Sequence, residues 1–251
     1  MSEQRKRRIF KEETPAKRTI PARISIVGPP GSGKSLSGLL LAKGLGSGVE
    51  NDIGVVETET GRSAFYMDKV SHKVVPFAAP FDSWAYLDAL EYCIERKYHT
   101  VIFDTMTSEH DDIGGVMALH NRITDKIGGR MASTRAWGPA KEGRLQLIRR
   151  MKTAPLNVIM IFKAKDKVRF KGNDATPLGW VHIGGDEFFY ETQVGIVLKH
   201  GGDGVPCWNP RTDAERFDRK RPGWARSVLN GQVTPADGEF IASWLRGDQL
   251  S

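Results

Sequence analysis

The octapeptide Gly28-Pro29-Pro30-Gly31-Ser32-Gly33-Lys34-Ser35 decides the fold of this chain. It fits the pattern G-x-x-x-x-G-K-[ST], in which the backbone N–H groups of a Gly-rich loop surround phosphates. An apolar, β-branched stretch (residues 24–27) precedes it, and a helical stripe of apolar residues (residues 35–45) follows it. This is the context that the pattern requires, because the N-terminus of the helix contributes its positive end. We therefore predict a phosphate-binding loop, or P-loop.

Each residue type in the loop has a role in this pattern. Lys34 is predicted to reach the β- and γ-phosphates, and the hydroxyl of Ser35 is predicted to hold Mg²⁺. The predicted ligand is ATP with Mg²⁺. The residues predicted to contact it are Gly28, Pro29, Pro30, Gly31, Ser32, Gly33, Lys34, Ser35 and Leu36.

Strand and helix patterns alternate downstream of the loop. Strands are predicted at residues 53–56, 73–77, 100–103 and 157–162, and helices from Asp82 or Ser83 to about 97, with Trp84, Leu87, Leu90 and Ile94 on one face, and at residues 140–152. Such alternation predicts an α/β fold with a mostly parallel sheet and helices on both faces. After Lys163, short apolar pieces such as residues 191–198 predict antiparallel additions, and Phe240, Ile241, Trp244 and Leu245 predict a closing helix.

The bulk properties indicate one soluble domain. The 251 residues are enough for a single α/β domain, predicted at 23–251, after a flexible basic arm at 1–22. No apolar run approaches the ~20 residues of a membrane span, and the charged N-terminus lacks the pattern of a signal peptide. Cys93 and Cys207 are far apart and in no metal-ligand spacing. We therefore predict a cytoplasmic protein without a membrane partner.

The net charge of +7 is unevenly distributed. Residues 120–171 hold 14 Lys/Arg against 3 Asp/Glu, a net +11, and residues 1–23 hold a further net +5. The rest of the chain has a net charge of −9. Two basic blocks on an otherwise acidic chain predict a region that binds a polyanion.

Charged residues follow three of the predicted strands. Asp104 ends one strand and is predicted to sit beside the Mg²⁺ site. Glu59 is our choice for the carboxylate that orients the attacking water, with Glu57 as the alternative. Lys163 follows a further strand and is a candidate for stabilising the developing negative charge. A solvated or DNA-facing role for Lys163 and Lys165 is an equal alternative.

Taken together, these residues resemble the RecA-like core of P-loop ATPases. The resemblance rests on Val55-Val56-Glu57-Thr58-Glu59, on Phe103-Asp104-Thr105 and on the strand before Lys163. It covers about residues 23–200. Its closest form is the small phage-encoded RecA-like ATPases of single-strand annealing and recombination systems, the phage AAA-type nucleotide-binding family. Those proteins show a Trp-Gly opening the helix before the switch strand, as in Trp137-Gly138, and a late Tyr-Glu strand, as in Tyr190-Glu191.

The resemblance implies a RecA-like P-loop NTPase core with Lys34, Glu59, Asp104 and Lys163 as catalytic residues. RecA has a glutamine where Lys163 stands, so the chain departs from the pattern at the residue that couples DNA to ATP. The loops that face DNA in RecA-like proteins fall here in or beside the +11 block. The residues predicted to contact DNA are Arg122, Lys126, Arg130 and Arg135 in the first loop, and Lys167, Arg169 and Lys171 in the second.

The leading functional hypothesis is a DNA-stimulated ATPase that binds single-stranded DNA and promotes annealing or strand exchange. The expected partners are single-stranded DNA, further copies of this chain and a single-strand-binding protein, in a bacterial host cell if the protein is phage-encoded. Self-association is assigned to Ile9-Phe10, the one apolar spot in the basic arm. Arg144, Arg149, Arg150 and Lys152 are assigned to the solvated face of a helix and left out of the DNA site.

Two other classes compete with this hypothesis. In a small-molecule or nucleoside kinase, the basic block is an Arg-rich lid over the phosphates, although its roughly fifty residues exceed what a lid requires. A nucleotide-dependent loader or assembly factor requires no hydrolysis for its binding role. Hydrolysis measured with and without single-stranded DNA separates the three.

Overall fold

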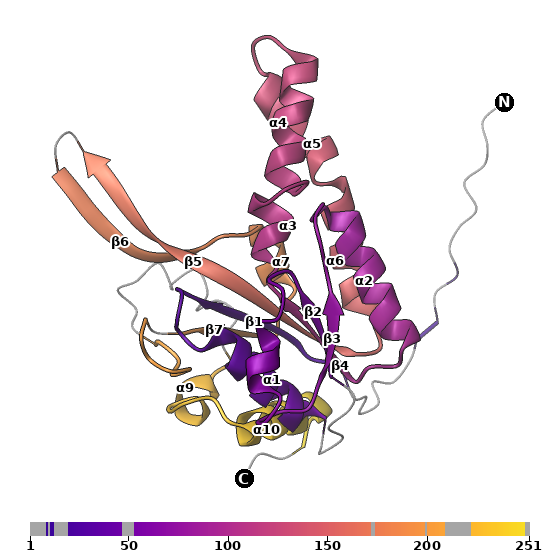
Figure 1. Cartoon of the computed structure of the whole chain (residues 1–251), viewed down its shortest axis with the longest axis vertical. Helices are drawn as coiled ribbons and strands as arrows, with labels where there is room; N and C mark the ends of the chain where they lie inside the picture. Colours follow the sequence, from indigo (N-terminus) through magenta and orange to yellow (C-terminus); the bar gives the residue numbers. More distant parts are fainter. Residues whose placement is uncertain are drawn as a thin grey trace.

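A computed structural model of the chain shows a seven-stranded β-sheet with helices on both faces (Figure 1). The structure describes residues 9, 11–12, 20–46, 53–171, 174–198, 200–208 and 222–248. The strands are β1 (Arg23–Gly28), β2 (Ile53–Glu57), β3 (Lys73–Pro76), β4 (Thr100–Asp104), β5 (Asn157–Lys171), β6 (Asp174–His182) and β7 (Val194–Val197). The helices are α1 (Lys34–Leu45), η1 (Ser63–Tyr66), α2 (Ser83–Glu95), α3 (Thr107–Asp111), α4 (Val116–Ile127), α5 (Ala132–Ala140), α6 (Glu142–Thr153), α7 (Asp186–Tyr190), α9 (Ala225–Val228) and α10 (Pro235–Arg246).

The sheet is parallel except at one strand, which confirms the predicted fold class. The order is β3-β2-β4-β5-β1-β7, with every neighbouring pair parallel, and β6 pairs with β5 in the antiparallel sense. In this register Gly28 lies beside Lys163, and Glu57 lies beside Asp104. The carboxyl ends of β1, β5, β4 and β2 therefore meet at one edge, where open α/β sheets bind their ligands.

The strands alternate between two hydrophobic cores. On β5, Val158 and Met160 belong to the core that α2 and α6 cover, whereas Ile159 and Ile161 belong to the core beneath α1 and α10. Both sets are almost fully buried. A strand buried on both faces is continuously apolar, which is why these strands are evident in the sequence.

Helix α2 begins as predicted, and Leu87, Leu90 and Ile94 pack against the core as predicted, but Trp84 does not. Asp82 accepts hydrogen bonds from the backbone N–H groups of Trp84 and Ala85. Trp84 is half-exposed, and the buried stripe contains Tyr86 instead. Tyr86 fits inside because its hydroxyl donates to the carbonyl of Thr105 at 2.7 Å, which satisfies its polar end.

Two elements project from the sheet where the sequence predicted loops (Figure 1). The first is the helical arm, residues 116–140, in which α4 packs along α5. Its turn takes positive φ angles at Gly128, Gly129 and Met131. The second is the β-hairpin, residues 164–182, because β5 continues past the predicted strand end at Phe162 and pairs with β6.

Several later predictions need correction. The segment at 191–198 contributes β7, which pairs with β1 in the parallel sense, because a long connection brings it back beside β1. Tyr190 ends α7 rather than lying in a strand, and Trp137-Gly138 lies within α5 rather than opening α6. The closing helix is present as α10. Most of the predicted basic arm, including Phe10, lies outside the described residues.

In the ranges that the structure describes, no helix is both long and apolar enough to span a bilayer.

Candidate nucleotide site

The P-loop joins β1 to α1 in a conformation that depends on its glycines. Gly31 and Gly33 have φ angles of 72° and 86°, in the left-handed region that side chains disfavour. A Cβ at Gly33 would also lie 2.6 Å from the backbone nitrogen of Gly204. Gly204 in turn donates its N–H to the carbonyl of Ser32 at 2.9 Å. The loop is thus held from outside by a distant turn of the chain.

Lys34 lies inside the curve of the loop. Its Nζ donates to the carbonyl of Pro29 at 2.7 Å, and the residue is buried. Burial lowers the pKa of Lys34 from 10.5 to about 8, although the carboxylate of Asp104 favours the charged form. The ammonium is therefore held where an anion would stabilise its charge.

Ser35 and Asp104 meet across the sheet edge. The Ser35 hydroxyl donates to Oδ2 of Asp104 at 2.5 Å. Burial raises the pKa of Asp104, while the Ser35 hydrogen bond and the charge of Arg62 oppose this shift. A hydroxyl and a carboxylate that lie together at the start of α1 form the oxygen donor set that Mg²⁺ prefers.

Glu59 lies between two cations beside these residues. One carboxylate oxygen contacts Nζ of Lys163 at 2.5 Å, and the other contacts Arg62. Burial raises the pKa of Glu59, but the hydrogen bond and charge of Lys163, followed by those of Arg62, bring it below its ordinary value. All three side chains line a cavity of about 250 Å³ together with Lys34 and Asp104.

Glu57, the alternative to Glu59, is directed away from this cavity. Its two carboxylate oxygens accept the backbone N–H groups of Gly61, at 3.0 Å, and Ser63, at 2.5 Å. The residue is only 4% exposed. Glu57 therefore fixes the turn that carries Glu59 and Arg62, and it has no oxygen directed at the P-loop.

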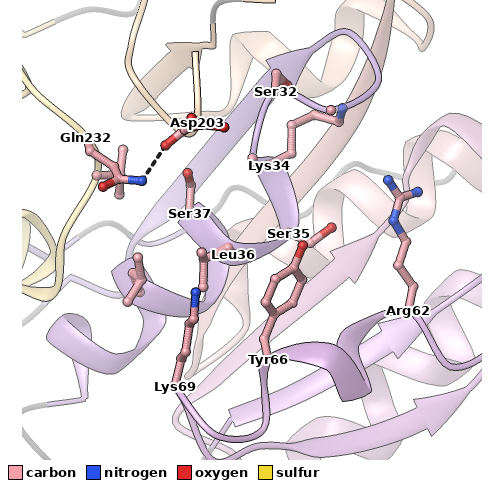
Figure 2. Close-up of a pocket in the computed structure, with 14 residues that line it drawn as sticks. Ser32, Lys34, Ser35, Leu36, Ser37, Arg62, Tyr66, Lys69, Asp203 and Gln232 are labelled. Atoms are coloured by element: carbon pink, nitrogen blue, oxygen red, sulfur yellow. Dashed lines mark hydrogen bonds between the residues drawn. The ribbon is translucent and has the colours of Figure 1, made fainter. Parts of the chain in front are cut away.

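A second cavity of about 390 Å³ shares Lys34, Ser35 and Arg62 with the first (Figure 2). Figure 2 shows Asp203 and Gln232 on one side of the start of α1 and Arg62 on the other. The side-chain amide of Gln232 donates to the carbonyl of Asp203 at 2.6 Å. Tyr66 and Lys69 also line this cavity, which suits the nucleoside half of a ligand whose phosphates lie in the loop.

The predicted nucleotide residues lie at these two cavities or support them. Gly31, Ser32, Gly33, Lys34, Ser35 and Leu36 line the larger cavity, and Pro30 lines the smaller one. Pro29 supplies the carbonyl that Lys34 contacts. Gly28 allows the close approach of Ser32, whose Oγ would lie 2.4 Å from a Cβ at this position.

Arg62, Tyr66, Lys69, Asp203 and Gln232 also line these cavities but were not predicted from the sequence. Arg62 had a local signal, because it lies three residues from Glu59 in a turn rich in charge. Tyr66 and Lys69 follow on the same segment. Asp203 and Gln232 had no signal, because only the folded chain brings residues so far apart in sequence to the P-loop.

The residues predicted to contact DNA are not part of these cavities. Arg122, Lys126, Arg130 and Arg135 are exposed on the helical arm, and Lys167, Arg169 and Lys171 occupy positions on β5 within the β-hairpin. Both groups were predicted in loops. Arg130 does lie in a turn, between α4 and α5, but the others need correction, because the helices of the arm and the strand β5, paired with β6, carry them.

Arg144 also differs from its predicted role on a solvated helix face. It is 1% exposed and donates through Nη2 to Oε2 of Glu109 at 2.7 Å. A buried guanidinium requires such a partner. Arg150 is paired with Glu91 at the surface, in agreement with a solvated position.

The parallel sheet, the glycine-dependent loop and the paired Ser35 and Asp104 define a P-loop NTPase core. A family model described as an AAA domain matches residues 20–183, and the chain therefore belongs to this family. A search of the curated proteins finds no match.

Proposed function

We propose that this AAA-domain protein is an ATPase stimulated by single-stranded DNA, which it binds to promote annealing or strand exchange, as the resembling phage proteins do. One observation carries the proposal. Both basic projections are continuous with strands that reach the nucleotide site. The β-hairpin prolongs β5 immediately after Lys163, and the helical arm follows β4 through α3. A polyanion on either projection is thus connected to the site by a short stretch of ordered chain.

The P-loop and its neighbours fit a Mg²⁺–ATP complex. The loop has the glycine conformations that turn backbone N–H groups inward, and Lys34 lies within it. Ser35 and Asp104 would hold the cation. When bound, Mg²⁺ neutralises negative charge on the β- and γ-phosphates. The fit of these residues supports ATP and Mg²⁺ as ligands.

Hydrolysis requires a base for the attacking water, and we assign this role to Glu59. Its pKa, which is lower than usual, keeps it ionised at neutral pH, as a proton acceptor must be. Lys163 and Arg62 compete for the same carboxylate. A γ-phosphate in the adjoining cavity offers these cations a second anion, so their transfer to it would release Glu59 for catalysis.

Lys163 is also the residue through which we propose that DNA acts. Its backbone N–H donates to Oγ1 of Thr107 at 2.8 Å, and the backbone N–H of Ile183 donates to the Lys163 carbonyl at 2.8 Å. Thr107 begins α3 below the arm, and Ile183 follows β6. A shift of either projection therefore reaches the Lys163 backbone through hydrogen bonds.

The direct test is the rate of ATP hydrolysis with and without single-stranded DNA. We expect the DNA to raise the rate, because the proposed coupling runs through Lys163. A kinase would instead transfer phosphate to a small acceptor and ignore DNA, and a loader would bind ATP with little turnover in either condition. Hydrolysis that does not respond to DNA at any salt concentration would reject the proposal.

Removing charge from the tip of the helical arm should weaken DNA binding and its salt dependence together. Each lost phosphate contact lowers the log–log salt slope for a single strand by about 0.7. The double variant Arg130→Ala/Arg135→Ala should therefore bind more weakly, with a flatter slope, while ATP binding without DNA stays unchanged. Fluorescence anisotropy of a labelled oligonucleotide across salt concentrations measures both quantities.

The matched control removes two charges elsewhere. Lys73 and Arg96 are exposed on β3 and at the end of α2, so Lys73→Ala/Arg96→Ala should leave the salt slope as in the wild type. Equal losses in the two double variants would show that net charge, rather than the arm, governs binding.

Nucleotide binding should take up a proton in alkaline solution. The free site holds the pKa of Lys34 near 8, and a phosphate beside it restores a higher value. Between the two values the free ammonium is largely deprotonated and the bound one is protonated, so at about pH 9 binding consumes a proton. Calorimetry in buffers of different ionisation enthalpy should detect this uptake, which should disappear near pH 7 and in Lys34→Ala.

We further propose that the protein self-associates and that a single-strand-binding protein is a second partner. The basis is the resemblance stated above, together with the apolar pair Ile9-Phe10 in the basic N-terminal segment. Of this pair the structure describes Ile9, which is 91% exposed.

A further inference from the structure

A cavity of about 400 Å³ lies at the foot of the helical arm, separate from the nucleotide site. Residues from the ends of α3, α5 and α7 and from the start of α6 line it, and none of them lines the cavities around the P-loop. This volume lies within the range of about 300–1,000 Å³ that is usual for small-ligand sites.

A network of charged side chains builds the floor of this cavity. Arg144 is held by Glu109, which is fully buried and accepts a further hydrogen bond from the Ser83 hydroxyl at 2.5 Å. Glu187 contacts Arg144 at 3.3 Å and Lys141 at 2.5 Å. Because these charges pair with one another, the floor is already formed. Asp186, which contacts His182 at 3.0 Å, adds a further carboxylate to the lining. The floor offers neither the excess positive charge that a lone phosphate requires nor a metal ligand set.

The wall and rim of the cavity are aromatic. Tyr190 is 64% exposed at the end of α7, although a tyrosine of this size is ordinarily more deeply packed. Trp137 of α5 also lines the cavity, and its ring stacks on that of His120 with centroids 4.0 Å apart. Lys141 lies over the same indole at 5.2 Å. Gly184 and Gly185 add only backbone to the lining. The lining of the cavity therefore includes an exposed phenol and an indole that its neighbours hold in place.

The location of this cavity relates it to both basic projections. Trp137 belongs to α5 of the helical arm, and Gly184 follows the last residue of β6 by two positions. A strand of nucleic acid that crosses from the arm to the β-hairpin would thus pass its mouth. Exposed aromatic rings between basic surfaces are the usual means by which proteins hold single strands, since every base has a face for stacking.

We propose that this cavity receives one nucleobase of a bound single strand, which stacks on Tyr190. The inference rests on the proposed function, because it takes single-stranded DNA as the ligand. The paired charges and the additional carboxylate favour an uncharged ring with hydrogen-bond donors and acceptors over a free anion. The aromatic rim makes the contact tolerant of sequence, so the site would contribute affinity without selecting a particular base.

The test compares two oligonucleotides that differ only in their bases. One is oligothymidylate, and the other is an abasic chain of equal length, which keeps the phosphate charges and removes the stacking surfaces. Tyr190→Ala should lower the affinity for oligothymidylate about tenfold, within the range known for the loss of one base–aromatic stack. It should leave the affinity for the abasic chain and the salt slope unchanged. Tyr190→Phe should retain nearly the wild-type affinity, because the ring remains.

The control variant is Tyr92→Ala, which removes an exposed tyrosine from α2 and should change neither affinity. The inference fails if Tyr190→Ala binds oligothymidylate as tightly as the wild type, or if it loses equal affinity for both oligonucleotides. In those cases the wild type still binds DNA and the proposed function stands. A wild-type protein that binds neither oligonucleotide at low salt would overturn both.

Discussion

Lys34→Ala is expected to abolish nucleotide hydrolysis and leave the fold intact. The Lys34 ammonium is directed into the P-loop, where its contact is the carbonyl of Pro29. It is thus placed to meet phosphate oxygens as they gain charge, and losing one such group lowers turnover by about 10²-fold or more. Because burial disfavours the charged ammonium, the variant should unfold at a temperature equal to or above that of the wild type. Phosphate release and thermal unfolding measure the two effects.

Lys43→Ala is the matched control for this experiment. Lys43 lies in the last turn of the same helix, α1, and lines neither cavity at the P-loop. Its replacement should leave the turnover unchanged. If Lys34→Ala hydrolyses ATP at the wild-type rate, then the P-loop is not the site of hydrolysis. That result would also contradict the rest of the proposed mechanism.

The P-loop was predictable because its determinants are local. Strand, glycines, lysine and helix occupy fewer than thirty consecutive residues, and each has its own sequence signal. The position of Asp104 beside Ser35 was predictable for a related reason, because the first polar residue after a buried apolar stretch marks the end of the strand. In a parallel sheet the carboxyl ends of neighbouring strands lie at the same edge, so no further sequence signal is needed to predict that they meet.

Side-chain direction within a turn was not predictable. Glu57 and Glu59 are two residues apart, and the sequence offers no means to choose between them. The structure separates them because Glu57 accepts backbone hydrogen bonds from Gly61 and Ser63, whereas Glu59 contacts Lys163. That difference depends on how the turn closes, which is a property of backbone conformation rather than of residue type.

Arg144 had a signal that was overlooked. It shares the face of α6 on which Leu147, Ile148 and Met151 are buried, at helical spacing. A charged residue on an apolar face indicates a buried ion pair as readily as a solvated position. Its partner Glu109 lies far away in sequence, however, and only the fold brings the two together.

The helical arm and the β-hairpin show a different limit of prediction from sequence. The basic block was evident, but basic residues in an uneven apolar pattern predicted loops. The helical arm forms because α4 has α5 to pack against, and the last residues of β5 remain extended because β6 pairs with them. Both depend on contacts between segments that are weakly ordered alone.

Glu59→Gln is expected to keep ATP binding and slow hydrolysis by about 10²-fold or more, the usual contribution of a general base. The amide preserves the size of the side chain and accepts no proton at neutral pH. It also weakens the contacts with Lys163 and Arg62, which the structure shows on the carboxylate. Nucleotide affinity should therefore be equal to or higher than that of the wild type, because both cations become available to the phosphates. Single-turnover hydrolysis and nucleotide titration separate the two effects.

Glu57→Gln is the matched variant, with the same chemical change two residues away. One oxygen of Glu57 becomes an NH₂ group that faces a backbone N–H of Gly61 or Ser63, so a buried donor loses its acceptor. We expect a loss of about 1–3 kcal/mol of stability, with turnover reduced less than in Glu59→Gln. The pH–rate profile completes the distinction. In the wild type the rate falls at low pH as the general base becomes protonated, and only the variant that lacks this base should lose that acidic limb of the profile. If Glu57→Gln loses that limb while remaining as stable as the wild type, and Glu59→Gln keeps it, then Glu57 is the base and the Glu59 cluster has another role.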